Sequence, residues 1–118
     1  MSVDKMKIKE IAALLKEAEK TCKAIKQITF TNPDLDIGDA YQIQLLNIKK
    51  ELEEGKKITG KKIGLTSYAM QNLLGVDQPD FGHLLNSMEV KNNTIKRSTM
   101  ISPKVEAEIA FVLKKDIE

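Results

Sequence analysis

The chain has 118 residues, of which 42% are hydrophobic and 31% are charged, a composition typical of one globular domain with its own core. The formal net charge of +2 is too small to indicate a nucleic-acid or membrane-surface partner. A single cysteine excludes an intrachain disulfide framework, and no apolar run approaches the roughly 20 residues of a membrane span. We therefore expect a cytoplasmic protein whose partners include neither nucleic acid nor membrane.

Two amphipathic helices are predicted in the first half of the chain. Over residues 4–26 the apolar side chains recur at helical spacing after an Asp N-cap, and they include Cys22, which we expect to be a core thiol. A break around Pro33 precedes a second helix over residues 36–55, which also begins with an Asp and ends at a Gly. The expected buried stripe of this second helix consists of Ile37, Tyr41, Leu45, Ile48 and Leu52.

Residues 55–61 match the first seven positions of a phosphate-binding P-loop. The eighth position is Lys62, however, where the coordination of Mg²⁺ requires the hydroxyl of Ser or Thr. The preceding residues 49–54 also have a helical pattern, whereas a P-loop follows a strand. These two departures argue against a nucleotide site.

The middle of the chain alternates short elements with loops. A short strand is predicted at residues 61–65, followed by a short helix that Thr66 or Ser67 caps. Residues 75–82 form a loop by composition, with a proline and two glycines. Residues 89–96 are predicted to form a hairpin, because their central Asn-Asn pair tolerates positive φ angles. The only histidine, His83, is expected at the surface or the edge of the core rather than in a catalytic role.

A strand with two glutamates is predicted near the end of the chain. Residues 105–113 alternate apolar with other residues, which indicates a strand with one face in a core. Glu106 and Glu108 would then lie about 6.6 Å apart on one face. A hard divalent cation could join them, since Mg²⁺ prefers carboxylate oxygens at about 2.0–2.1 Å. A solvated strand face, balanced by Lys104 and Lys114, would carry the same pair, so the residues alone leave both interpretations open.

Four blocks of sequence occur in the order and spacing of a known family. They are residues 39–44, 60–67, 74–82 and 103–113. Together they resemble the 2-keto-4-pentenoate hydratase and 4-oxalocrotonate decarboxylase group of the fumarylacetoacetate hydrolase family. Several blocks in register are far more specific than any one motif.

The resemblance implies an α+β fold, in which a helical N-terminal unit is followed by the first strands of a β-rich, fumarylacetoacetate hydrolase-like catalytic domain. We place the boundary between residues 1–82 and residues 83–118. Proteins of this family are considerably longer, so we expect the chain to be the truncated front part of an enzyme and to be inactive alone. We also expect a homo-oligomer, because an apolar strand without partners tends to recruit another chain.

The resemblance also implies which residues form the site. Glu106 and Glu108 would hold Mg²⁺ or Mn²⁺ together with a third acidic ligand from later in the sequence. The other implied site residues are Lys62, Asp77 and Asp80 for proton transfer, and Leu65, Thr66 and Ser67 for substrate binding. From the residues alone, a solvated lysine and aspartates that satisfy turn amides remain open alternatives.

The activity implied by the resemblance is hydration of a small 2-oxo acid from aromatic catabolism. The hydratase would add water to 2-hydroxypenta-2,4-dienoate (2-keto-4-pentenoate) and give 4-hydroxy-2-oxopentanoate. Decarboxylation of 4-oxalocrotonate is the close alternative, because both reactions stabilise the same kind of enolate. A third possibility, from a different class, is a non-catalytic fragment that only folds and associates.

Overall fold

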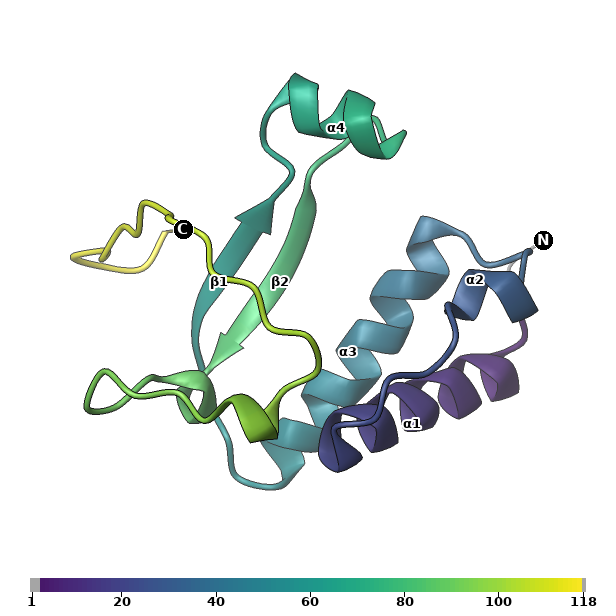
Figure 1. Ribbon diagram of the computed structural model, residues 1–118, viewed down its shortest axis with the longest axis horizontal. Coiled ribbons are helices and arrows are strands. Elements are labelled where there is room, and N and C mark those ends of the chain that lie inside the picture. Colours follow the sequence, from purple (N-terminus) through teal and green to yellow (C-terminus); the bar gives the residue numbers. More distant parts are fainter. Residues whose placement is uncertain (1–2, 118) are drawn as a thin grey trace.

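The structure is a computed structural model that describes residues 3–117. Helices fill the first half of the chain, and a two-stranded antiparallel sheet follows, which confirms the α+β prediction (Figure 1). The elements in chain order are α1 (Lys5–Thr21), α2 (Ile28–Thr31), α3 (Ile37–Glu53), β1 (Ile58–Gly64), α4 (Tyr68–Leu74), β2 (Asp80–Leu85) and two 3-10 helices (Asn86–Met88 and Arg97–Thr99).

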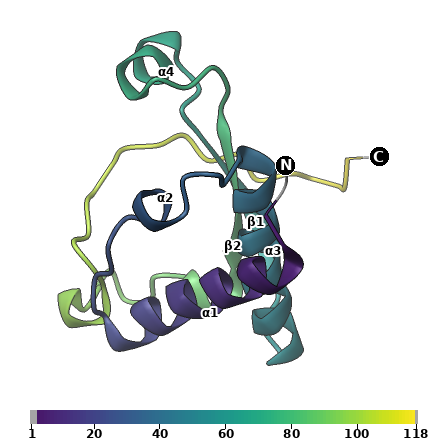
Figure 2. The same ribbon diagram turned by 90° about the vertical axis from the view of Figure 1, so that its right-hand side faces the viewer.

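The core lies between α1 and α3, which pack side by side, while the β1–β2 hairpin lies next to α3 with α4 at its far end (Figures 1 and 2). The buried cluster between α1 and α3 is small, because few side chains of the two helices meet. The buried residues of this cluster are Ile8, Ile11, Ala12 and Ile43, with Val3, Ile28, Leu35 and Leu46 packed against them. The helical unit therefore has its own core, and the hairpin is attached beside it.

Helix α1 begins as predicted and ends earlier. Asp4 is its N-cap, and the side chain of Asp4 accepts a hydrogen bond from the backbone N–H of Met6. The helix ends where Cys22 adopts a left-handed conformation with φ 53°, so Cys22 is half-buried at the helix end rather than in the core. Beyond it, Ile25 is 39% exposed, and a further turn would have buried little apolar surface.

A capping box fixes the beginning of α3, as the Asp N-cap predicts. The Oδ1 atom of Asp36 accepts from the backbone N–H of Asp39 at 2.8 Å, and Oδ2 of Asp39 accepts from the backbone N–H of Asp36 at 3.3 Å. Asp39 is only 1% exposed, and it also accepts from the backbone N–H of Val3 at 3.4 Å. The buried carboxylate of Asp39 thus completes the capping box of α3 and joins the N-terminal segment to this helix.

The predicted buried face of α3 is wrong. The inward stripe contains Asp39, Ile43, half-buried Asn47 and Glu51, whereas the predicted Leu45 is 50% exposed. Apolar periodicity missed this face because three of its four residues are polar. Most buried polar side chains of this kind have at least one hydrogen-bond partner.

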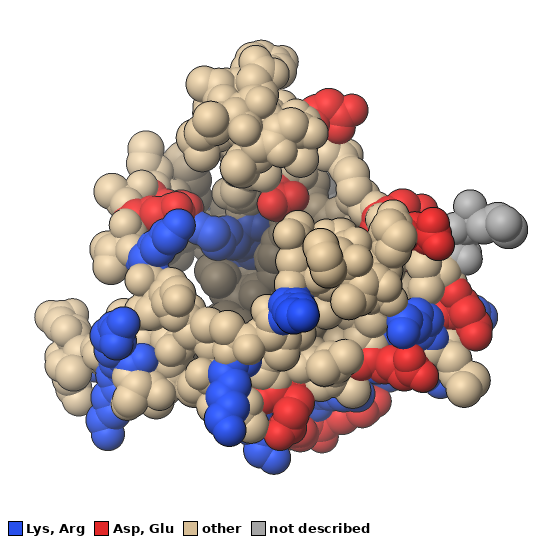
Figure 3. Space-filling view, turned by 45° about the vertical axis from the view of Figure 1, so that its right-hand side comes forward, with Lys and Arg blue, Asp and Glu red and all other residues tan. Residues whose placement is uncertain are grey.

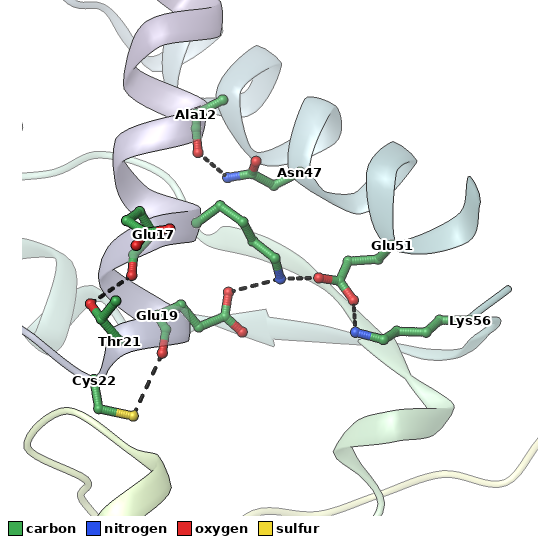
Figure 4. Close-up of polar contacts among 9 residues, drawn as sticks. Ala12, Glu17, Glu19, Thr21, Cys22, Asn47, Glu51 and Lys56 are labelled. Atoms are coloured by element: carbon green, nitrogen blue, oxygen red, sulfur yellow. Dashed lines mark hydrogen bonds and ion pairs between the residues drawn. The ribbon is translucent and has the colours of Figure 1, made fainter. Parts of the chain in front are cut away.

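Specific partners contact the two polar residues near the end of α3, although Oδ1 of Asn47 is buried without a hydrogen-bond partner among residues 3–117 (Figure 4). Asn47 donates from Nδ2 to the backbone carbonyl of Ala12 at 2.9 Å. Glu51, which is 5% exposed, forms ion pairs with Lys16 of α1 and with Lys56, just before β1. Glu51 therefore joins α1, α3 and the base of the hairpin.

Both strands of the sheet include residues that were not predicted to be strand. Strand β1 covers Ile58–Gly64 instead of residues 61–65, and β2 includes residues 80–82, which were predicted to be loop. The register pairs Ile58 with Leu85 and Gly64 with Asp80, with an irregularity between Ile58 and Gly60. Because β2 runs from residue 80 to residue 85, it crosses the expected domain boundary after residue 82.

The strands predicted in the last third of the chain are absent from the structure. Residues 89–96 contain the turn, with Asn92 and Asn93 at φ 57° and 50°, but they form no hairpin. Residues 105–113 have no regular secondary structure, and Val105 is 99% exposed. A strand needs a partner for its backbone groups, and the sheet of residues 3–117 contains only β1 and β2.

Positive and negative side chains are interspersed over the face seen in Figure 3, which agrees with the small net charge. Within residues 3–117, no helix combines the length and the apolar character needed to cross a bilayer.

Candidate functional site

A hollow of about 470 Å³ opens beside the far end of the hairpin. There β1, β2 and α4 meet the C-terminal segment, which is the part of the chain that contains Glu106 and Glu108. The hollow contains most of the residues that the resemblance assigned to a site. The predicted site residues that line it are Lys62, Leu65, Thr66, Ser67, Asp80, Glu106 and Glu108. Asp77 is not among the lining residues. The roles of all these residues stay predictions at this point.

The pairing of β1 with β2 gives Lys62 its direction. Adjacent residues of a strand point to opposite sides, so Lys62 faces the hollow and Lys61 faces away from it. Opposite Lys62 lies Gly82, whereas Lys61 lies opposite His83. A Cβ atom added at Gly82 would meet nothing within 4 Å, so packing does not require this glycine. Its position on the wall of the hollow is open, so the hollow has room opposite Lys62.

The turn between β1 and α4 is held in a fixed conformation. Leu65 directly follows β1 and has φ 54°, a left-handed conformation that few non-glycine residues adopt. Its carbonyl accepts a hydrogen bond from Nε2 of Gln71 at 2.8 Å, and Gln71 is 7% exposed. Ser67 caps α4 by accepting from the backbone N–H of Met70 at 3.3 Å, and Gly75 ends the helix, both as predicted. The lining residues 65–67 are thus positioned by α4.

An ion pair joins the hairpin to the C-terminal segment across the hollow. Nζ of Lys62 lies 2.5 Å from Oε1 of Glu108, and the two side chains are 48% and 47% exposed. The hydrogen bond to Glu108 raises the pKa of the Lys62 ammonium above its usual value, desolvation opposes the rise, and the charges of Glu108 and Glu106 add to it. Lys62 is therefore protonated at neutral pH and can donate a proton or a hydrogen bond.

Four lining residues were not singled out in the sequence: Gly64, Met70, Phe81 and Gly82. Glycines inside a strand often mark a close approach by a ligand, and this signal could have pointed to Gly64 and Gly82. Met70 and Phe81 carried no such signal, because an apolar residue in a short helix or loop is usually a packing residue.

Two residues of α3 hold the strand that carries Asp80. The hydroxyl oxygen of Tyr41 accepts a hydrogen bond from the backbone N–H of Phe81 at 3.1 Å. Nε2 of Gln44 donates to the backbone carbonyl of the same Phe81, also at 3.1 Å. Both backbone groups of Phe81 are thus bonded to α3, next to the lining residues Asp80 and Gly82. Tyr41 and Gln44 lie in the first resemblance block, but their contact with the hairpin could not be foreseen from helical spacing.

Known proteins similar to this chain are hydratases. The 2-keto-4-pentenoate hydratase of Paraburkholderia xenovorans (strain LB400) is 44% identical over 110 residues, covering 92% of this chain and 41% of the relative. A 2-hydroxypent-2,4-dienoate hydratase of Pseudomonas putida is 39% identical over 117 residues, covering 98% of this chain and 53% of the relative. The chain is homologous to these hydratases. It spans about half of their length or less, which fits their N-terminal part.

A solved structure supports the same grouping. The 4-oxalocrotonate decarboxylase from Pseudomonas putida G7, complexed with magnesium and adipate, superposes with a TM-score of 0.70 at 29% identity. The match covers 73% of this chain and 33% of the decarboxylase, and the same protein complexed with calcium and acetate matches equally well. No family model matches the chain. The homologous hydratases and this neighbour confirm the family resemblance and the fold predicted from the sequence.

The described residues fit part of a site for a divalent cation. Glu106 and Glu108 offer carboxylate oxygens, the ligands that Mg²⁺ and Ca²⁺ prefer, on the wall of one hollow. The ammonium of Lys62 forms an ion pair with Glu108, so this carboxylate takes a positively charged partner in the hollow. Among residues 3–117 there is no group of three His, Cys, Asp or Glu residues able to hold a metal ion. The chain therefore offers two ligands and an open site.

Proposed function

We propose that this chain forms part of the active site of a metal-dependent hydratase that adds water to 2-hydroxypenta-2,4-dienoate and gives 4-hydroxy-2-oxopentanoate. One observation carries the proposal: Lys62, Asp80, Glu106 and Glu108 line a single hollow, although they come from three separate segments. The 44% identity to a 2-keto-4-pentenoate hydratase supports this choice of substrate. The reaction belongs to the catabolism of aromatic compounds.

In this proposal Glu106 and Glu108 hold the cation, Mg²⁺ or Mn²⁺. When bound, such an ion supplies a Lewis acid for an oxygen of a 2-oxo acid. The magnesium and calcium bound by the decarboxylase neighbour support a divalent ion of this kind. Further ligands would come from outside the described residues.

Lys62 and Asp80 handle protons and charge in this proposal. The ammonium of Lys62, which lines the hollow, donates a hydrogen bond to an anionic oxygen of the substrate. Asp80 lies at the end of β2, where it lines the hollow, and its carboxylate accepts or returns a proton on the carbon chain. Between the two predicted aspartates the hollow favours Asp80, because Asp77 lies outside its lining.

The turn after β1 binds the substrate in this proposal. Leu65, Thr66 and Ser67 all line the hollow, and two of them carry hydroxyl groups. Because Gln71 holds the carbonyl of Leu65, this turn keeps its shape without a ligand. Such preorganisation reduces the entropy lost when a small acid binds.

Decarboxylation of 4-oxalocrotonate is the second candidate, and the solved neighbour with that activity favours it. The carboxylates and Lys62 would serve either reaction, because both develop negative charge on the same part of a 2-oxo acid. The two candidates therefore differ in substrate and product rather than in the residues of this hollow.

The two reactions are separated by assaying a chimera. Because the chain matches 41% of the Paraburkholderia xenovorans hydratase, residues 1–118 would replace the matching part of that enzyme. We expect the chimera, supplied with Mg²⁺, to consume 2-hydroxypenta-2,4-dienoate and form 4-hydroxy-2-oxopentanoate, with the intact relative as the positive control. Residues 1–118 alone should give no turnover. Release of CO₂ from 4-oxalocrotonate without hydration would support the second candidate, and a folded chimera with neither activity would favour a non-catalytic fragment.

A further inference from the structure

Lys62 forms an ion pair with Glu108, which is one of the two carboxylates that the proposed function assigns to the metal. Nζ of Lys62 lies 2.5 Å from Oε1 of Glu108, so the ammonium donates a short, charge-assisted hydrogen bond to this carboxylate. Glu106 also attracts this ammonium electrostatically. Among the described residues, this is the one ion pair that involves the segment after Arg97.

Two carboxylates on one wall repel each other unless a positive charge lies close to them. Lys62 supplies this charge, since Glu106 and Glu108 line the same hollow and both act on its ammonium. A divalent cation supplies the same compensation with more charge, and it needs the oxygen of Glu108 that Lys62 now contacts. The ammonium and the cation also repel each other, so both are not accommodated on Glu108 at once.

We propose that Lys62 is an internal counter-ion of the metal-free site, and that a divalent cation binds by displacing Lys62 from Glu108. This inference rests on the proposed function, because it takes Glu106 and Glu108 as metal ligands. The displaced ammonium stays inside the hollow, which Lys62 and Gly82 both line and which has a volume of about 470 Å³. Metal binding thereby frees a positively charged donor that an anionic substrate can meet, so the cation is expected to bind before the substrate.

The test is a titration of the full chain with Mn²⁺, in which the electron paramagnetic resonance signal of free Mn²⁺ reports binding. The variants are Lys62→Met, which keeps the length of the side chain, and Lys62→Gln, which keeps a hydrogen-bond donor. The matched control is Lys61→Met, which removes the same charge from the same strand on the side facing away from the hollow. Unchanged unfolding midpoints would show that every variant is folded.

We expect the unaltered chain to bind weakly, with a Kd on the order of a millimolar, because two carboxylates leave the site open. Both Lys62 variants should bind Mn²⁺ about three- to tenfold more tightly, while Lys61→Met should change the affinity little. In the unaltered chain, added Mg²⁺ should also shift the NMR signal of the Lys62 Cε methylene, and the signal of Lys61 should stay in place.

Four results would overturn the inference. Weaker binding by the Lys62 variants would mean that Lys62 holds Glu108 in position for the metal. An equal gain in Mn²⁺ affinity for Lys61→Met would mean that the effect comes from the net charge of the chain and not from the position of Lys62. Equal affinity in all variants, lost on Glu106→Gln, would contradict the counter-ion and leave the metal site of the proposed function intact. Absence of binding in every variant would contradict the inference, and the chimera assay would then test the proposed function separately.

Discussion

At the scale of single residues, the positions of the polar groups depend on individual partners. Glu51 shows this best, since a carboxylate on the inward face of α3 is stable there because Lys16 and Lys56 reach it from two directions. Hydropathy alone predicts a charged residue on the outside, so the sequence did not indicate this contact. The site residues were easier to predict, because the resemblance named Lys62, Glu106 and other residues that line the hollow.

Replacement of Glu51 by Gln should destabilise the fold by about 1–3 kcal/mol, because it leaves two lysines without their shared partner at a largely buried position. Glu53→Gln is the matched control, since Glu53 is on the same helix and its pair with Lys49 is 3.9 Å long and exposed. The control should change the free energy of unfolding by less than about 0.5 kcal/mol. Urea denaturation measures both, and equal effects would remove the structural role assigned to Glu51.

The ion pair of Lys62 has a defined pH dependence. Because Glu108 raises the pKa of the Lys62 ammonium, the pair should be intact at neutral pH and should be lost as the pH rises through the raised pKa. An NMR titration of the Lys62 Cε methylene measures this midpoint. Glu108→Gln should lower the midpoint, and an unchanged midpoint would show that Glu108 does not hold the ammonium.

At the scale of elements, local chemistry was predictable and pairing over a distance was not. The N-caps Asp4, Asp36 and Ser67 were all predicted, because capping depends on residues within one turn. The strand predicted over residues 105–113 did not form, since the alternation of its side chains shows which face would be buried but provides no partner for its backbone. Strand β2 was not predicted, for the reverse reason: its pairing with β1 overrides the loop-like composition of residues 80–82.

The attachment of the hairpin to α3 can be tested at one amide. Tyr41→Phe removes the acceptor of the Phe81 N–H, so hydrogen exchange at Phe81 should become about three- to tenfold faster. Tyr68→Phe is the control, because Tyr68 is 84% exposed. NMR-detected exchange compares the two variants. If Phe81 exchanges equally fast in both, α3 does not hold β2 through this hydroxyl.

At the scale of the whole molecule, we propose that the chain self-associates, because its C-terminal segment exposes apolar side chains. Phe111 and Val112 are 85% and 98% exposed, and burying a side chain of this size contributes about 1.5–3 kcal/mol. Light scattering over a concentration series should show a rising mass, and Phe111→Ser should weaken the association. Phe30→Ser, at an 80% exposed position in α2, is the control. A stable monomer at several hundred micromolar would contradict the proposal.

The proposed function requires that the hollow is the site of the hydratase reaction. The most direct measurement is the kcat of the chimera with 2-hydroxypenta-2,4-dienoate after Lys62→Ala and after Lys61→Ala. These lysines are neighbours on β1 and carry equal charge, but Lys62 alone of the two lines the hollow. We predict that Lys62→Ala lowers kcat by about 10²–10⁴-fold, as the loss of a proton-transfer group does, and that Lys61→Ala has little effect. Small and equal effects at both positions would contradict the assignment of this hollow as the active site.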